Sequence, residues 1–187
     1  LAEEGEHPDL VIWPENASDV NPFTDPQAGA AIAGAAREVG APLLVGTITR
    51  DEAGERNTMQ VFNADGSAGD HHYKRFLQPF GEYMPMRDFF RHFSDMVDLA
   101  GDFKAGSDDG VVRMGDTRVG VATCYEVAED KAYRTAVRDG AQLLATPTNN
   151  ATFGFADMTY QQLAMSRMRA VETDRAVVVT ATSGVSA

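Results

Sequence analysis

Three reactive side chains follow segments that the sequence predicts to be strands. Cys124, the only cysteine, comes directly after the apolar alternation of residues 118–123. Glu15 follows the apolar run 9–13, and Lys74 ends a third predicted strand. If these strands are neighbours in one sheet, their ends converge at the edge where open α/β sheets usually present their chemistry. The sequence therefore predicts a site that contains a thiol, a carboxylate and an ammonium group.

These three groups have complementary roles in acyl transfer. The carboxylate of Glu15 can accept the thiol proton, the ammonium of Lys74 can stabilise a thiolate and an oxyanion, and Cys124 can attack a carbonyl carbon to form a thioester. Each residue also has a structural interpretation, as a small buried hydrophobe, a turn carboxylate or an exposed strand end. The separations along the chain carry no local geometry, so they leave both interpretations open.

Composition narrows the class of protein. The 187 residues suffice for one domain with a buried core, and no linker divides them. The formal charge of -12 argues against a nucleic-acid partner, which would need a basic face. A single cysteine allows no internal disulfide, and no run approaches the roughly 18 apolar residues of a membrane span. The four histidines have no metal-binding spacing, because His71 and His72 point to opposite faces of a strand.

The elements that must position the site alternate between strands and helices. Asp25-Pro26 predicts the start of a helix that ends at Gly40, and residues 64–67 predict a hairpin turn. Residues 50–56 predict a polar turn. The predicted strands are 9–13, 42–49, 57–63, 72–74, 111–114, 118–123, 141–146 and 176–180, and the predicted helices are 26–39, 86–99, 129–138 and 156–174. One face of the last helix is expected to carry Tyr160, Ala164, Met168 and Val171. This mixture predicts an α/β sandwich with parallel and antiparallel pairs.

The segments around the three reactive groups resemble a known family. These segments are Trp13-Pro14-Glu15-Asn16-Ala17, residues 73–85 and Cys124-Tyr125-Glu126, and they are similar to the nitrilase, or carbon-nitrogen hydrolase, superfamily. The sequence Pro-Phe-Gly-Glu-Tyr-Met-Pro at 79–85 resembles the apolipoprotein N-acyltransferase branch more than the small soluble amidases. Residues 148–154 and 162–172 continue the resemblance, which covers nearly the whole chain.

The resemblance implies a fold and a set of site residues. The fold is the αββα sandwich with mixed sheets, here truncated at both ends, so that residues 1–187 are a single partial domain. The Glu-Lys-Cys triad of the superfamily maps to Glu15, Lys74 and Cys124. Glu82 would be a second essential carboxylate that helps to keep a buried lysine charged, and Tyr125 and Glu126 would support the nucleophile. No metal or organic cofactor is implied.

The resemblance also implies an activity and a location. The cysteine would take a fatty acyl chain from the sn-1 position of a phospholipid and pass it to the α-amine of the diacylglyceryl-cysteine that begins an apolipoprotein. The membrane-helix domain of the parent protein would lie outside this chain and hold it at the extracytoplasmic face of a bacterial inner membrane. The alternatives are a soluble amidase that uses the same triad and a catalytically inactive scaffold, which the intact triad disfavours.

The aromatic stretch from Phe76 to Phe103 has two interpretations. It either packs a small core of its own, as long functional loops do, or forms a lid whose apolar side chains dip into lipid. In the second case Arg75, Arg87 and Arg91 are expected to meet phosphate head groups. Because the missing elements would leave strand edges unpaired, we expect the isolated fragment to be poorly stable or inactive. A monodisperse 187-residue fragment that melts cooperatively would contradict this expectation.

Overall fold

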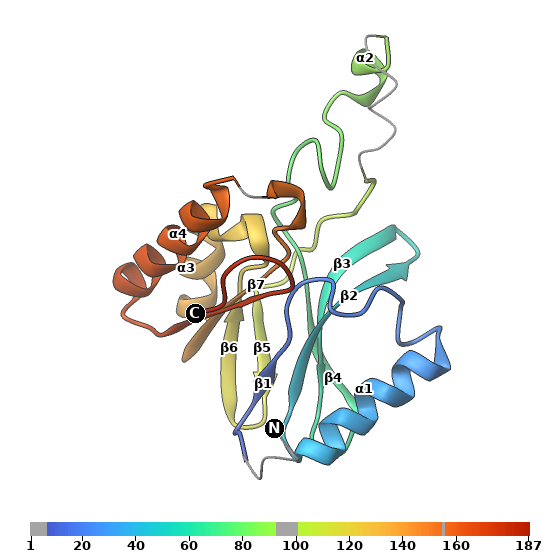
Figure 1. The fold of residues 1–187 in the computed structure, drawn as a ribbon, viewed down its shortest axis with the longest axis vertical. Helices are drawn as coiled ribbons and strands as arrows, with labels where there is room; N and C mark the ends of the chain where they lie inside the picture. Colours follow the sequence, from blue (N-terminus) through green and yellow to red (C-terminus); the bar gives the residue numbers. More distant parts are fainter. Residues whose placement is uncertain (1–6, 93–100, 155) are drawn as a thin grey trace.

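Two four-stranded sheets pack face to face, and helices cover their outer faces, in a computed structural model that describes residues 7–92, 101–154 and 156–187 (Figure 1). The strand order is β1-β2-β3-β4 in one sheet and β5-β6-β7-β8 in the other. Each sheet mixes parallel and antiparallel pairs. The predicted αββα sandwich with mixed sheets is therefore confirmed.

The first sheet is built around a long hairpin with α1 on its outer face. Strand β1 pairs parallel with β2, and β2, β3 and β4 pair antiparallel. Ile32 and Ala36 of the helix pack on Leu43, Val45 and Phe62 of the sheet. The bounds are β1 Val11–Ile12, α1 Pro26–Val39, β2 Leu43–Asp51, β3 Gly54–Phe62 and β4 Ala68–Tyr73.

The second sheet begins with a hairpin and continues with parallel strands. Strands β5 and β6 pair antiparallel, whereas β6, β7 and β8 run parallel because helices connect them. The bounds are β5 Val111–Met114, β6 Thr117–Val121, a 3₁₀ helix η3 Cys124–Ala128, α3 Asp130–Arg138, β7 Leu143–Thr148, a second 3₁₀ helix η4 Ala151–Phe153, α4 Met158–Thr173 and β8 Val177–Ala181.

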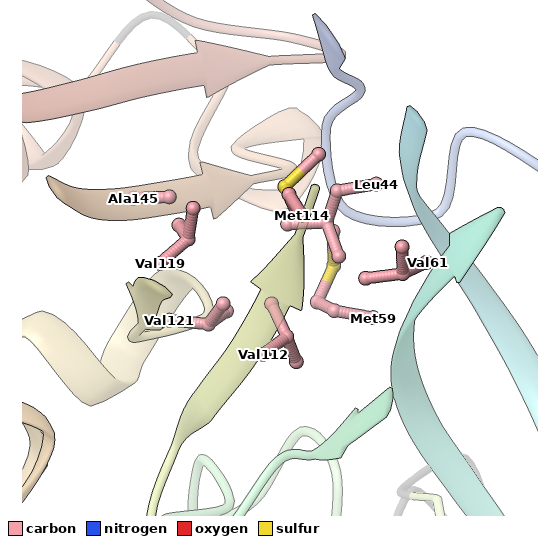
Figure 2. Close-up of a cluster of buried hydrophobic side chains, with 8 residues drawn as sticks. All are labelled: Leu44, Met59, Val61, Val112, Met114, Val119, Val121 and Ala145. Atoms are coloured by element: carbon pink, nitrogen blue, oxygen red, sulfur yellow. The ribbon is translucent and has the colours of Figure 1, made fainter. Parts of the chain in front are cut away.

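The main core lies between the two sheets. Figure 2 shows side chains from both sheets pointing toward one another across this interface. All of them are buried, and their contacts fix the distance between the strands of one sheet and those of the other. The members of the cluster are Leu44, Met59 and Val61 from the first sheet and Val112, Met114, Val119, Val121 and Ala145 from the second.

Local signals placed several boundaries well. Asp25 caps α1 by accepting hydrogen bonds from the Gln27 and Ala28 amides, and Gly40 ends it with a left-handed backbone (φ 70°). The turn predicted at 50–56 is present but shorter, because β2 runs to Asp51 and β3 begins at Gly54. Its charged side chains form cross-strand pairs instead, Arg50 with Glu55 at 2.7 Å and Arg56 with Asp51 at 2.9 Å.

The last helix is turned differently from what its pattern suggested. The predicted apolar face is exposed, with Val171 81% exposed, and the buried face carries Thr159, Gln162, Leu163 and Ser166. A polar face is buried here because Gln162 and Ser166 have partners on β7. Apolar spacing alone therefore identified the helix but not its inner side.

An arm, described here for residues 75–92 and 101–109, leaves the sandwich at the end of β4 and returns at β5 (Figure 1). The predicted helix 86–99 appears as α2, Arg87–Phe90, and its second half lies outside the described residues. Phe80, Met86 and Phe89 are exposed on this arm. Arg75 was expected to face phosphate head groups if this stretch is a lid. Its guanidinium instead donates to the carbonyls of Asp108 and Ala132.

Within residues 7–92, 101–154 and 156–187, no helix has the length and hydropathy needed to cross a membrane.

Candidate active site

Glu15 is held at the strand ends by β2 and by the segments that follow β7 and β8. Two residues before it, Trp13 donates its amide to Leu44 of β2, so the chain runs beside that strand up to Pro14. Gly46 permits this approach, since a Cβ there would lie 2.3 Å from the Pro14 carbonyl oxygen. The carboxylate accepts from the Asn149 amide at 2.9 Å, and the backbone carbonyl accepts from Thr182 Oγ1 at 2.7 Å. The carboxylate is therefore fixed from both sheets.

Lys74 follows β4 directly and is 2% exposed. Its Nζ lies 3.1 Å from Glu15 Oε1 and 2.8 Å from Glu82 Oε2. Burial alone would lower the pKa of Lys74, but the charges of Glu15 and Glu82 outweigh burial and raise that pKa above its usual value. The lysine is therefore an ammonium held between two carboxylates.

Asn57 of β3 ties the two carboxylates together. Its Nδ2 donates to Glu15 Oε1 at 2.7 Å and to Glu82 Oε1 at 2.8 Å. The Gln78 amide also donates to Glu82, at 2.8 Å, so a hydrogen bond within the arm holds the same carboxylate. Sequence reasoning missed Asn57, and the only signal for it was a polar residue in a strand that is otherwise largely buried.

Cys124 begins η3, three residues after the end of β6. Its backbone is left-handed (φ 52°), which is uncommon for a residue other than glycine and projects its side chain from a sharp turn. The thiol is 4% exposed, and Gln162 Nε2 lies 3.5 Å from Sγ. Burial and the Glu15 charge raise the pKa of the thiol, while Lys74, Thr148 and Gln162 act in the opposite direction. Such a thiol needs a base to become a nucleophile.

A cavity of about 530 Å³ joins these groups. Glu15, Lys74, Glu82 and Cys124 all line it, together with Asn57. The structure thus brings together every member of the predicted triad and the second carboxylate. A carbonyl compound in this cavity would meet a thiol, a carboxylate and an ammonium at once, which is the arrangement that acyl transfer requires.

The two residues after the cysteine lie elsewhere. Tyr125 lines two adjoining cavities, of about 580 and about 140 Å³, that share wall residues with the Cys124 cavity. Glu126 is fully buried and accepts hydrogen bonds from the amides of Thr123, Arg75 and Phe76. It therefore contacts the backbone beside Cys124 and beside Lys74.

The histidines differ from one another as their alternation on the strand predicts. His71 is exposed, whereas His72 is fully buried beside Asp108 and Glu126. The part of the chain that the structure describes contains no group of three or more His, Cys, Asp or Glu residues suited to holding a metal ion.

Comparison with curated sequences gives relatives that share one name. The chain is 47% identical over 186 residues to an apolipoprotein N-acyltransferase from Mycolicibacterium smegmatis, covering 96% of the chain and 31% of that relative. It is 32% identical over 182 residues to an apolipoprotein N-acyltransferase from Geobacter metallireducens, covering 95% of the chain and 35% of that relative. The chain thus spans about a third of the length of these curated relatives.

Solved structures share the fold at lower identity. A carbon-nitrogen hydrolase from Helicobacter pylori superposes with a TM-score of 0.72 at 16% identity, covering 98% of this chain and 65% of that one. A mutant amidase from Nesterenkonia, in which acrylamide has added to the active-site cysteine, superposes with a TM-score of 0.62 at 19% identity, covering 96% and 66%. The family model for carbon-nitrogen hydrolases matches residues 3–186. Since that match runs through every strand and helix described above, the chain belongs to the carbon-nitrogen hydrolase family.

Proposed function

We propose that this chain is the catalytic domain of an N-acyltransferase that completes bacterial lipoproteins. In this proposal Cys124 takes a fatty acyl chain from a phospholipid and passes it to the α-amine of the diacylglyceryl-cysteine that begins an apolipoprotein. The observation that carries it is the cavity in which Cys124, Lys74, Glu15 and Glu82 meet. The 47% identity to a relative named for this activity supports the choice of acceptor.

The first half-reaction forms the thioester. Glu15 accepts the proton of the Cys124 thiol, and the sulfur attacks the ester carbonyl carbon of the phospholipid. Lys74 stabilises both the thiolate and the oxyanion of the tetrahedral intermediate, because its ammonium is already held at the cavity wall and needs no reorganisation. The carbon–oxygen bond then breaks, and the proton on Glu15 passes to the leaving oxygen of the lysophospholipid.

The second half-reaction transfers the acyl group to nitrogen. The neutral amine of the acceptor attacks the thioester carbon, and Glu15 accepts the proton that the nitrogen loses. The carbon–sulfur bond then breaks and regenerates the thiolate, which recovers its proton from Glu15. Glu82 keeps Lys74 charged and in place through both steps, since its Oε2 lies 2.8 Å from Nζ.

The arm supports a lipid substrate. Phe80, Met86 and Phe89 are exposed on the arm, and Phe80 also lines the cavity of Cys124. We propose that this arm borders the membrane and guides an acyl chain to the thiol. The location that follows is the extracytoplasmic face of a bacterial inner membrane, to which helices of the full-length protein would hold the domain.

Peptide mass spectrometry on the full-length protein that we propose contains this chain tests the function. After incubation with a phospholipid, we expect a fatty acyl adduct on Cys124 that is absent from Cys124→Ala. Addition of a diacylglyceryl-cysteine peptide should remove the adduct and acylate the peptide amine. An adduct that persists in Cys124→Ala would contradict the assigned nucleophile.

An amidase is the alternative, because carbon-nitrogen hydrolases of this fold include amidases. The same experiment separates the two functions. An amidase would transfer the acyl group to water at the same rate with and without the peptide, and would release ammonia from simple amides. Peptide-independent loss of the adduct would therefore overturn the proposed acceptor while leaving the nucleophile in place.

A further inference from the structure

A second buried cation lies two residues before Lys74. His72 is fully buried on β4, and both of its ring nitrogens face carboxylates. Nδ1 lies 2.6 Å from Asp108 Oδ1, and Nε2 lies 3.1 Å from Glu126 Oε2. The mechanism described above makes no use of this cluster, although His72 and Glu126 are as deeply buried as Lys74 and Glu15.

The carboxylate of Glu126 joins the two halves of the active site. One oxygen accepts from the amides of Arg75 and Phe76, the two residues directly after Lys74, at 2.8 and 3.1 Å. The other accepts from the Thr123 amide, directly before Cys124, at 2.8 Å. The chain after the lysine and the chain before the cysteine are therefore hydrogen-bonded to one side chain.

His72 holds the Glu126 side chain through its Nε2 atom. Burial would lower the pKa of His72, but the charges and hydrogen bonds of Glu126 and Asp108 outweigh burial and raise it to about 9. At neutral pH the ring is an imidazolium that donates from both nitrogens. Asp108 is itself held by the amides of Tyr73 and Gly110, so the ring has an immobile partner on its far side.

We propose that His72 is a positioning residue that, through Glu126, holds the Lys74 segment against the turn that carries Cys124. The two reactive residues come from different sheets, so no strand pairing fixes their separation. The pair formed by His72 and Glu126 supplies that link. This inference rests on Cys124 being the nucleophile of the proposed function.

The expected consequence is a change in the reactivity of the thiol. The charged groups that face Cys124 are Glu15, which disfavours the thiolate, and Lys74, which favours it. Those that face His72 are Asp108 and Glu126. If the link to Glu126 is lost, Lys74 and Cys124 separate and the thiolate loses its stabilising charge. The thiol then ionises at higher pH and reacts more slowly at neutral pH.

Two substitutions of His72 separate positioning from stability. The amide of glutamine can take the place of Nε2 and donate to Glu126, whereas the amide of asparagine can take the place of Nδ1 and donate to Asp108. Both remove the charge and one hydrogen bond, so both should lower the stability by similar amounts. Only His72→Asn removes the side-chain donor of Glu126 and leaves it to the three backbone amides alone.

The probe is alkylation of Cys124 by iodoacetamide across pH, followed by peptide mass spectrometry on the full-length protein. We expect His72→Asn to move the midpoint of the profile upward by about one pH unit, which is about a tenfold slower reaction at neutral pH. His72→Gln should keep most of the wild-type reactivity. His71→Asn, which changes the exposed neighbour, is the matched control.

Each outcome decides the matter. A shift in His72→Asn that His72→Gln largely restores supports the positioning role. Equal shifts in the two variants, or no shift in either, would overturn it, and thermal denaturation shows whether the variants lost equal stability. Alkylation needs no lipid, so the alkylation profile can still be interpreted if the acyl-transfer experiment fails. Failure of the positioning role and failure of the proposed function can therefore be distinguished.

Discussion

Strand β4 and the residue after it present two buried cations, each between two carboxylates. The open cluster consists of Lys74, Glu15 and Glu82, and its three members line the cavity of Cys124. The sealed cluster consists of His72, Asp108 and Glu126. The two cations are two positions apart and so lie on the same face of the extended chain.

The difference between the clusters lies in what the cation can reach. In the open cluster the ammonium borders a space of about 530 Å³ that can receive a substrate. In the sealed cluster both ring nitrogens are already occupied by protein oxygens. We therefore propose that the same electrostatic arrangement stabilises reaction charge in one place and holds the backbone in the other, and variants can test this division.

The largest effect is expected from removing the cation of the open cluster. Lys74→Met should slow thioester formation on the order of 10³-fold or more, because the thiolate and the oxyanion both lose their stabilising charge. The rate of acyl-adduct formation at Cys124 measures this loss, with the exposed lysine variant Lys131→Met as the control. A rate within tenfold of the wild type would remove Lys74 from the mechanism.

Neutral substitution of Glu126 should reduce stability more than neutral substitution of Glu82. Glu126→Gln breaks a fully buried ion pair and should lower the free energy of unfolding by about 3 to 5 kcal/mol. Glu82→Gln should lower it by only about 1 kcal/mol, because the Glu82 side chain keeps some exposure, yet it should slow thioester formation strongly. Denaturant unfolding and adduct formation, measured on both variants, check the contrast. Similar stability losses in the two would contradict it.

The sealed cluster should make stability depend on pH. The pKa of His72 is raised from 6.5 to about 9 in the folded state. Its contribution, on the order of 2 to 3 kcal/mol, is fully present below pH 6.5 and is lost as the pH rises through 9. The pKa of Lys74 is raised from a value already above this range, so Lys74 contributes no slope there.

Thermal denaturation between pH 6 and pH 10 measures this slope. We expect His72→Gln to flatten the decline in stability between about pH 6.5 and 9, whereas His71→Asn should leave it as in the wild type. A decline of wild-type size in His72→Gln would assign the pH dependence to other groups.

The smallest effect is expected from adding a methyl group at Gly46, next to the backbone of Glu15. Gly46→Ala places a Cβ 2.3 Å from the Pro14 carbonyl oxygen and 2.7 Å from Glu15 Cα, so the Glu15 segment must shift. We expect a cost of about 1 to 2 kcal/mol and slower thioester formation, with Cys124 alkylation at high pH little changed. Gly34→Ala, which has nothing within 4 Å, is the control and should be neutral or slightly stabilising.

The sequence predicted those parts of the fold that have local signals. The capped helix α1 and the hairpin turn at 64–67 follow from residues adjacent in the chain. The turn predicted at 50–56 is shorter than expected because its charges are satisfied across the hairpin, which a local pattern does not reveal. The buried face of α4 was not predictable for a similar reason, since Gln162 is buried against partners in other elements.

The site was predicted in part. Strand ends and a family resemblance together pointed to Glu15, Lys74, Cys124 and Glu82, and the structure brings these residues together. The contacts of Glu126 with His72 were not predictable, because 54 positions separate the two residues and burial of a charge leaves no mark in composition. Their adjacency depends on the packing of one sheet against the other.

The hydrogen bonds of Glu15 have a consequence for synthesis on the ribosome. Its carboxylate is fixed by Asn149 and its carbonyl by Thr182, which are made 134 and 167 residues later. A nascent chain that has reached Cys124 therefore already exposes a thiol, but its base still lacks these two anchors. Because chains emerge from their N-terminal end, the proposed base reaches its anchored position only after Thr182 has been translated.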